Sequence, residues 1–491
     1  MTQYLTTVFL TLILLSATVL AGPLSQIRSF DAEKSLVEIE VTRTTYNYNI
    51  PWITGNTQTR KNGIVIAQNR ILTTADGLSG QYLCRVRKGG QSRHYTAEIL
   101  WIDYHTNIAL FRVKEDAFWN GMRPVKLASK LPMSGDDLNV YRWRGGRIES
   151  RAAEIIRLFI GKSKTSYIRH ISLAVSSEIN AAGWAEVVIH KNQLIGLTSS
   201  GSDQRLNILP APFIDFVLQG HEGNKAPGAA FFDFGWMDGK NPALLRSKSF
   251  QENGTGVVVT EIGKRGLSKN TLRSGDILFE IDGFSIDHDG KYIDPDFGRL
   301  SIDGLATRSR FAGEKIPMKI WRDGSELTIE YKLPEADFRK SVIPEQCYDC
   351  PPEYLVAGGL VFQPLTGPLL RALGQNTPLL LEYYEAHPPI GERNGLVLLS
   401  MVLPDDYNRG YESARLLLVD QINGNSINCL RDVETALEEA DDGYHRIRFM
   451  KDESIIHMIL DAKELPAATN RILERYQIPK QSFMKPLLNE S

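Results

Sequence analysis

The sequence predicts a mainly β protein with several domains, and three observations support this. Its 491 residues correspond to about three domains of ordinary size. Polar turn pairs, Lys-Asn at 191–192 and Asp-Gly at 323–324, separate apolar runs as they do in β-hairpins. An apolar-x-x-Ile-(Asp or Asn)-Gly element occurs at 278–283 and again at 419–424, so the last two domains are weak internal repeats.

Residues 1–21 are predicted to be a signal peptide. The apolar run 8–21 fits a signal-peptide core, with cleavage after Ala21. It is too short for a membrane span, and no later stretch approaches the roughly 18 apolar residues that a span needs. Because residues 1–7 contain no Lys or Arg, an uncleaved N-terminal anchor is the alternative. We expect an exported protein, periplasmic or otherwise extracytoplasmic, without a stable membrane span after cleavage.

The composition argues against several classes of ligand. With 56 basic and 58 acidic residues, the chain gives no reason to expect nucleic acid as a partner. The Cys-x-x-Cys motif of Cys347 and Cys350 lacks the further ligands that zinc needs, and two prolines follow where a thioredoxin motif would continue into a helix. We expect a linker with either a local disulfide or two free thiols, and neither a metal nor a cofactor.

Residues 35–219 are predicted to form the first domain. Apolar, β-rich runs occur at 35–43, 63–66, 70–78 and 96–113, and a small-residue elbow at 179–184 leads into the hairpin around 191–192. The runs 70–78 (RILTTADGL), 101–113 and 194–197 (LIGL) resemble the corresponding stretches of the HtrA/Deg serine protease family. This resemblance implies a chymotrypsin-like double β-barrel.

The positions that carry the catalytic triad in that family are changed here. Asp76 stands at the position of the catalytic His, Asn107 at that of the orienting Asp, and Trp184 at that of the nucleophilic Ser. A carboxylate with a pKa near 4 cannot replace an imidazole as the general base at neutral pH. Ala185 and Glu186 also replace the two glycines that follow the family's serine. We therefore expect no catalytic residues in this domain.

Three places in the sequence contain histidines or serines that a relocated catalytic site could use. His105 would share a strand face with Asn107, and His170 lies two residues before Ser172. Ser176 and Ser177 precede the elbow. Nothing in the spacing of these residues favours a catalytic arrangement.

Residues 230–334 are predicted to form a peptide-binding domain. The stretch 272–283 (LRSGDILFEIDG), after a strand at 256–262, resembles a PDZ domain. PDZ domains bind a peptide as an added edge strand and hold its carboxylate in an apolar-Gly-apolar loop. Phe234, Gly235 and Trp236 are the candidates for that loop. The alternative is that the aromatic residues belong to the core and the groove is occluded.

Residues 353–480 are predicted to form a second, divergent PDZ domain. The stretches 354–370, 396–406 and 418–427 resemble the second PDZ domain of the plant-type Deg branch. This resemblance implies a role in oligomer assembly and not in ligand capture. The pattern at 467–476 predicts an amphipathic helix, packed either on its own domain or on a neighbouring subunit.

The predicted fold is therefore a chymotrypsin-like double β-barrel followed by two PDZ-like α+β domains. Our hypothesis for its function is an exported, catalytically inactive pseudoprotease, a scaffold or adaptor of protein quality control that binds polypeptide C-termini or unfolded proteins. The family resemblance implies a homo-oligomer based on trimers, or a hetero-oligomer with an active paralogue. The alternatives are an active serine endopeptidase with an atypical site and a regulatory subunit of an active Deg paralogue.

Overall fold

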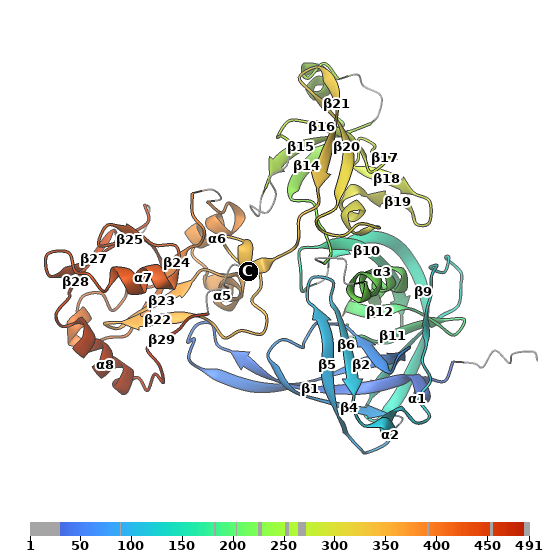
Figure 1. Ribbon diagram of the computed structural model, residues 1–491, viewed down its shortest axis with the longest axis horizontal. Coiled ribbons are helices and arrows are strands. Elements are labelled where there is room, and N and C mark those ends of the chain that lie inside the picture. The colour runs from blue at the N-terminus through green and yellow to red at the C-terminus, as the bar shows by residue number, and fades with distance from the viewer. Residues whose placement is uncertain are drawn as a thin grey trace, which may run out of the picture.

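The computed structural model describes residues 30–88, 90–162, 164–180, 183–202, 204–223, 228–250, 255–263, 272–389, 392–451 and 455–485. The protein is mainly β, as predicted, with two barrel-like sheets followed by two smaller α+β units (Figure 1). The predicted signal peptide, residues 1–21, lies outside the described residues. Among the described helices, none has the length and apolar character needed to cross a membrane.

The first sheet is a closed six-stranded barrel with the strand order β1-β2-β3-β6-β5-β4. Val37, Ile39, Val86 and Phe111 fill its interior and have no exposed surface. The short helices α1 and α2 flank it. The elements are α1 (Ala32–Ser35), β1 (Leu36–Tyr46), β2 (Thr54–Ile66), β3 (Arg70–Thr73), β4 (Gln81–Lys88), β5 (Tyr95–Asp103), β6 (Ile108–Val113) and α2 (Asp116–Trp119).

The second sheet has seven strands, and an additional pairing of β11 with β12 closes six of them into a ring. The predicted hairpin turn is present, with Lys191 and Asn192 both at positive φ (46° and 65°), as a type I′ turn requires. The elements are β7 (Lys126–Leu127), β8 (Leu138–Arg144), β9 (Arg147–Lys162), β10 (Arg169–Ser177), β11 (Val187–His190), β12 (Gln193–Ser202), β13 (Arg205–Pro210) and α3 (Ala211–Glu222). Together the two sheets confirm the double-barrel prediction.

The next sheet has the path β14-β15-β16-β20-β21, which leaves β14 at one edge. The predicted Asp-Gly turn joins β20 to β21, with Asp323 and Gly324 at φ 49° and 81°. Its elements are β14 (Phe234–Asp238), α4 (Pro242–Ser247), β15 (Val257–Ile262), β16 (Ile277–Ile281), β17 (Phe284–Ser285), β18 (Lys291–Asp294), β19 (Gly298–Ser301), η1 (Ile302–Thr307), β20 (Lys315–Arg322) and β21 (Ser325–Lys332).

The last sheet has the order β28-β27-β25-β24-β23-β22-β29. The predicted amphipathic helix is α8, and it packs on its own sheet, where Ile472 contacts Tyr354, Val356 and Val361. The elements are η2 (Phe338–Lys340), β22 (Tyr354–Ala357), β23 (Leu360–Pro364), α5 (Gly367–Leu373), η3 (Gly374–Asn376), α6 (Leu379–Ala386), β24 (Val397–Val402), η4 (Asp406–Asn408), β25 (Leu417–Ile422), β26 (Asn425–Ser426), α7 (Leu430–Ala436), β27 (Tyr444–Phe449), β28 (His457–Asp461), α8 (Leu465–Arg475) and β29 (Ser482–Phe483).

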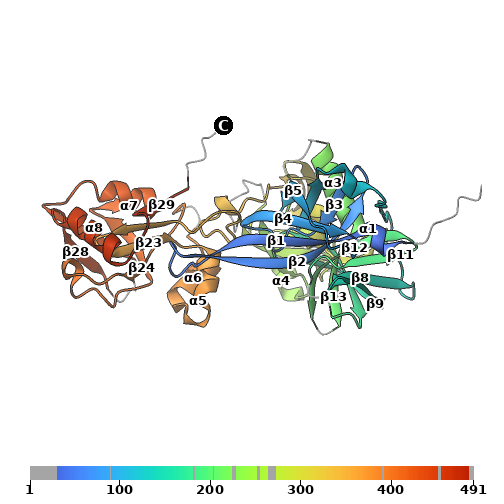
Figure 2. The same ribbon diagram turned by 90° about the horizontal axis from the view of Figure 1, so that it is seen from below.

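The hairpin formed by β1 and β2 extends far beyond the barrel and reaches the C-terminal sheet (Figure 2). At its tip the carbonyl oxygen of Tyr48 accepts a hydrogen bond from Gln363 Nε2 at 3.1 Å. Trp52 meets Tyr354 edge to face, with 5.7 Å between the ring centroids. The first and last parts of the chain therefore pack directly against each other.

The sheet of β14 to β21 rests on the second barrel, above β10 in Figure 1. A Cβ added to Gly304 would lie 2.3 Å from Ile160 Cδ1, so η1 approaches β9 as closely as glycine allows. Thr307 Oγ1 donates to the carbonyl of Arg169 at 2.9 Å, and Phe216 stacks on Phe311 with centroids 4.4 Å apart.

Candidate functional site

The structure brings Asp76, Asn107 and Trp184 together. Asn107 Oδ1 accepts the backbone N–H of Asp76 at 2.8 Å and so ties the end of β3 to the start of β6. The carbonyl of Trp184 accepts from both the backbone N–H (2.9 Å) and the side-chain Nδ2 (3.2 Å) of Asn62. Each contact is a structural hydrogen bond to the backbone.

The indole ring of Trp184 packs onto the loop that carries Asp76. A Cβ added to Gly77, which has φ +79°, would lie 2.7 Å from Trp184 Cζ3. The aromatic ring therefore occupies the space directly beside Asp76 and Gly77.

A buried lysine lies beneath this loop. Lys61 Nζ donates to the carbonyl oxygens of Thr74 and Asp76, the latter at 2.5 Å, and to Thr74 Oγ1 at 3.0 Å. Nζ also lies 6.0 Å from the centroid of the Trp184 ring. Burial lowers the pKa of Lys61 to about 7, against the opposing influence of Asp76 and Glu186.

Lys61 could not have been identified from the sequence. Lysine is usually exposed, and the polar alternation at 54–62 gives no sign that this side chain points inward. Glu186 is likewise buried, and its carboxylate accepts from Thr198 Oγ1. The residues around Asp76 and Trp184 are therefore engaged in internal hydrogen bonds, and Thr74, whose hydroxyl contacts Lys61, has no exposed surface.

An Asn107→Ala variant is expected to lose about 2–4 kcal/mol of local stability. The change leaves the partly buried N–H of Asp76 without its acceptor, and alanine tolerates the φ of +60° less well than asparagine. An Asn107→Gly variant removes the same acceptor but relieves the backbone strain, so it should be the less destabilised of the two. Hydrogen exchange of the β3 and β6 amides measures both; unchanged exchange in the alanine variant would contradict the assignment.

The structure places His105 next to a serine, Ser166. His105 Nδ1 lies 3.2 Å from Ser166 Oγ, and its ring stacks on Phe338 with centroids 4.1 Å apart. Asp103 accepts from the backbone N–H of His105 and from Thr106 Oγ1, so it does not orient the imidazole. Burial lowers the pKa of His105. The other histidine, His170, is almost completely buried. Its Nδ1 lies 2.8 Å from the carbonyl oxygen of Ile171 and 3.5 Å from Ser172 Oγ.

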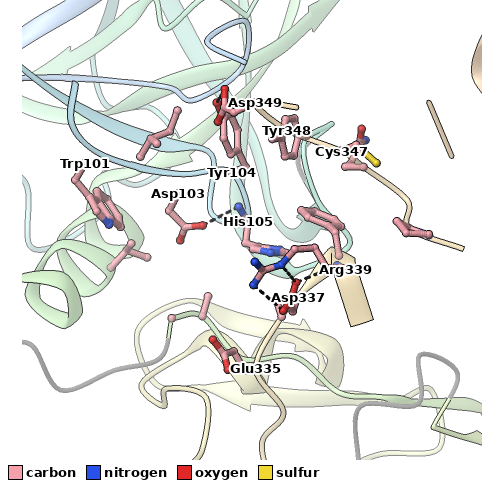
Figure 3. Close-up of a pocket in the computed structure, with 18 of the residues that line it drawn as sticks. Trp101, Asp103, Tyr104, His105, Glu335, Asp337, Arg339, Cys347, Tyr348 and Asp349 are labelled. Carbon is pink, nitrogen blue, oxygen red and sulfur yellow. Dashed lines mark hydrogen bonds and ion pairs between the residues drawn. The ribbon is translucent and has the colours of Figure 1, made fainter. Parts of the chain in front are cut away.

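His105 lines a cavity of about 1080 Å³ between the first barrel, α3 and the segment 335–350 (Figure 3). In Figure 3 the ion pair of Asp337 and Arg339 lies close to the His105 ring. The cavity wall mixes aromatic rings with charges of both signs. No group of three or more His, Cys, Asp or Glu side chains in the described residues could hold a metal ion.

The segment with the Cys-x-x-Cys motif is fastened to the barrel at this cavity. Tyr348 stacks on Tyr104 with centroids 3.9 Å apart, and its hydroxyl donates to the carbonyl of Thr165 at 2.8 Å. Asp349 Oδ1 accepts from the backbone N–H of Gly80 (2.9 Å) and from the Tyr104 hydroxyl (3.0 Å). Cys347 and Cys350, on either side of these anchors, are free thiols in the structure.

The predicted peptide-binding residues Phe234, Gly235 and Trp236 begin the edge strand β14 and line a pocket of about 410 Å³. Trp236 Nε1 donates to Asp303 Oδ1 at 3.1 Å, and its ring lies against Gly290, where an added Cβ would be 2.3 Å from Cη2. Both aromatic residues are half-buried against the core of their sheet. The two rings therefore pack on the core of the sheet, and a pocket lies beside them.

In the C-terminal sheet, the strand that corresponds to β14 is β23, and it does not lie at the edge of the sheet. β23 pairs with β24 as β14 pairs with β15, but its other edge is covered by β22, which runs antiparallel to it. α7 packs against both β22 and β23. The place that an added peptide strand would take is filled by the chain's own β22.

Comparison with known proteins finds a matching family model and several similar proteins. A family model described as "PDZ domain" matches residues 343–483. "Putative protease Do-like 3, mitochondrial" of Arabidopsis thaliana is 26% identical over 438 residues, which cover 87% of this chain and 76% of the relative. "Protease Do-like 2, chloroplastic" of the same plant is 25% identical over 463 residues, covering 91% of this chain and 74% of the relative. A solved structure, "HtrA-type protease AlgW with decapeptide", is 14% identical and aligns with a TM-score of 0.46 over 62% of this chain and 96% of its own.

The fold and the relatives define an HtrA/Deg-like protein with a trypsin-like fold and a PDZ domain. More particularly, its relatives are the plant Do-like proteases, so the predicted resemblance to the plant-type Deg branch is confirmed.

Proposed function

We propose that this chain is a pseudoprotease that acts as a peptide- or unfolded-protein-binding scaffold. The observation that carries the proposal is the arrangement around Asp76, Asn107 and Trp184. The Asn107 side chain accepts the backbone N–H of Asp76, and the Trp184 ring covers Gly77. Lys61 donates to the backbone carbonyls of Thr74 and Asp76. Acyl transfer needs an accessible nucleophile in contact with a base, and these three positions supply neither.

The proposed organisation follows the sequence prediction. The pseudoprotease domain spans 35–219, the ligand-binding PDZ domain 230–334 and the second PDZ domain 353–480. The position of β14 at the end of its sheet, with no described strand paired to its other side, supports peptide binding by the first PDZ domain, while the corresponding side of β23 is taken by β22. We also propose export after cleavage of residues 1–21 and an oligomer, either of this chain alone or with an active paralogue. Protein quality control remains the proposed setting.

The proposal is tested with denatured casein and a fluorophosphonate serine probe. Purified mature protein is expected to retain casein, to leave it uncleaved and to show no probe labelling. A Trp184→Ser variant purified in parallel is the matched control, because a contaminating protease would act in both preparations. Casein cleavage that follows the wild-type protein through purification, together with probe labelling, would overturn the proposal.

The alternative of an active peptidase has one specific candidate in the structure, the His105–Ser166 pair. Its geometry is unfavourable, since Ser166 is only 6% exposed and its Oγ accepts the backbone N–H of Ile168 at 3.1 Å. If the wild type were labelled by the probe, a Ser166→Ala variant would decide whether this serine is responsible. The regulatory-subunit alternative predicts a change in casein cleavage by a triad-intact paralogue when the two chains are mixed.

A further inference from the structure

The pocket beside the first residues of β14 is built by two domains. The PDZ domain supplies Phe232, Phe234 and Trp236, and the second barrel supplies Lys162 and Arg169. Lys162 ends β9, Arg169 begins β10, and the two residues are direct partners across that hairpin. Two cations of the barrel thus face an aromatic wall of the PDZ domain.

The charges in this pocket do not cancel. Arg169 Nε lies 3.8 Å from Asp303 Oδ2, and 52% of the Arg169 side chain is exposed. Lys162 is exposed and forms no ion pair with any residue that the structure describes. Asp303 is the single acid among the lining residues, so Lys162 and Arg169 leave the pocket with a surplus of positive charge.

The strand direction decides which end of a peptide would meet these cations. β14 lies at the edge of its sheet, and its first three residues, Phe234 to Trp236, line the pocket, whereas its last two, Met237 and Asp238, do not. A peptide strand added antiparallel to β14 has its carboxyl end beside the first residues of β14. Its terminal carboxylate would therefore arrive at Lys162 and Arg169, and its last side chain would meet the aromatic wall.

We propose that Lys162 and Arg169 bind the terminal carboxylate of a polypeptide C-terminus with an apolar last residue, docked on β14. The barrel then completes the ligand site of the PDZ domain and selects for a free, negatively charged chain end. This inference rests on the proposed function, in which the first PDZ domain binds polypeptide ends. It adds which residues outside that domain recognise the ligand.

Substitution of Asp303 is expected to strengthen ligand binding, an effect that a general loss of structure would not produce. Its carboxylate competes with the ligand for Arg169 and repels the incoming chain end. An Asp303→Asn variant keeps an acceptor for Trp236 Nε1 but removes the charge. This variant is expected to bind the ligand about threefold more tightly, whereas loss of the cations weakens binding.

The experiment uses the full-length protein immobilised on a surface and a pool of random decapeptides with apolar last residues. The pool is prepared with free and with amidated carboxyl ends. The wild type is expected to retain the free pool about tenfold better, and a Lys162→Glu, Arg169→Glu double variant is expected to lose about tenfold of that retention. An Arg157→Glu variant is the matched control, because Arg157 is an exposed cation of β9 outside the pocket. Raising NaCl from about 0.05 M to about 0.5 M should weaken the wild-type preference, because salt screens charge pairs at this exposure.

The outcomes separate this inference from the proposed function. Equal retention of free and amidated peptides by the wild type, or unchanged retention by the double variant, would overturn the role of Lys162 and Arg169 while leaving peptide binding intact. Retention of neither pool by the wild type would contradict peptide binding itself, and with it both proposals.

Discussion

A Lys61→Met variant is expected to lose about 3 kcal/mol of stability at pH 7. Methionine keeps the length and the apolar stem of the side chain, but it leaves the carbonyls of Thr74 and Asp76 and the hydroxyl of Thr74 without their buried donor. The loss should appear as a lower urea midpoint of the full-length chain and as faster hydrogen exchange in β2 and β3. An Arg60→Met variant is the control, because the neighbouring Arg60 side chain is 61% exposed.

The same lysine gives the stability a characteristic dependence on pH. The folded pKa is about 7, whereas that of an unfolded lysine is about 10.4, so the unfolded chain binds more protons between these values. The contribution of Lys61 therefore makes the fold more stable as the pH rises above 7, by roughly 2–3 kcal/mol at pH 9, and is constant below pH 7. The methionine variant should lack this gain. The measurement is the urea midpoint of wild type and variant between pH 7 and pH 9. If the two profiles have the same slope, Lys61 remains charged in the folded state.

A His170→Asn variant is expected to make the protein less sensitive to acid. His170 stacks on Phe213 with centroids 4.5 Å apart, and its Nε2 is buried with no hydrogen-bond partner in the described structure. Burial lowers its pKa to about 4, from about 6.5 in an unfolded chain. Because the unfolded chain binds the extra proton between these values, the stability that His170 contributes falls by roughly 3 kcal/mol as the pH drops from 6.5 to 4.

The measurement is the urea midpoint of wild type and variant between pH 7 and pH 4. Asparagine retains a donor near the position of Nδ1 but cannot titrate, so the variant should show a shallower decline despite a lower stability at pH 7. His105 and His445, whose pKa values burial also lowers, contribute the acid sensitivity that remains. A variant of the exposed His94, His94→Asn, serves as the control. If stability declines as steeply in the His170 variant as in the wild type, the folded protein protonates His170 as readily as the unfolded chain does, and the prediction is wrong.

Local signals in the sequence predicted the elements that depend only on neighbouring residues. In the positive-φ turns at 191–192 and 323–324, three of the four residues, Asn192, Asp323 and Gly324, are of types that tolerate this backbone conformation. The apolar period at 467–476 predicted α8, which the structure places at Leu465–Arg475. The equivalence of Asp76, Asn107 and Trp184 to the triad came from the family resemblance, and its consequence for catalysis remains a proposal.

What could not be predicted depends on contacts between residues far apart in the chain. The burial of Lys61 depends on Thr74 and Asp76 in the loop after β3, and the pairing of His105 with Ser166 joins residues 61 positions apart. The cations near Phe234 belong to a different domain, so no pattern within 230–334 contained them. The covering of β23 by β22 is local by contrast, because Gly358 and Gly359, both at positive φ, join the two strands, and this Gly-Gly pair is a turn signal that the sequence does contain.

The contact between the β1–β2 hairpin and the C-terminal sheet has a consequence for how the chain is made. Tyr48 and Trp52 leave the ribosome about 300 residues before their partners Gln363 and Tyr354. At synthesis rates of about 5–20 residues per second, the aromatic tip waits for about 15–60 seconds without its partners. The first strands of the barrel can pair early, but their far ends are completed only when almost the whole chain has emerged.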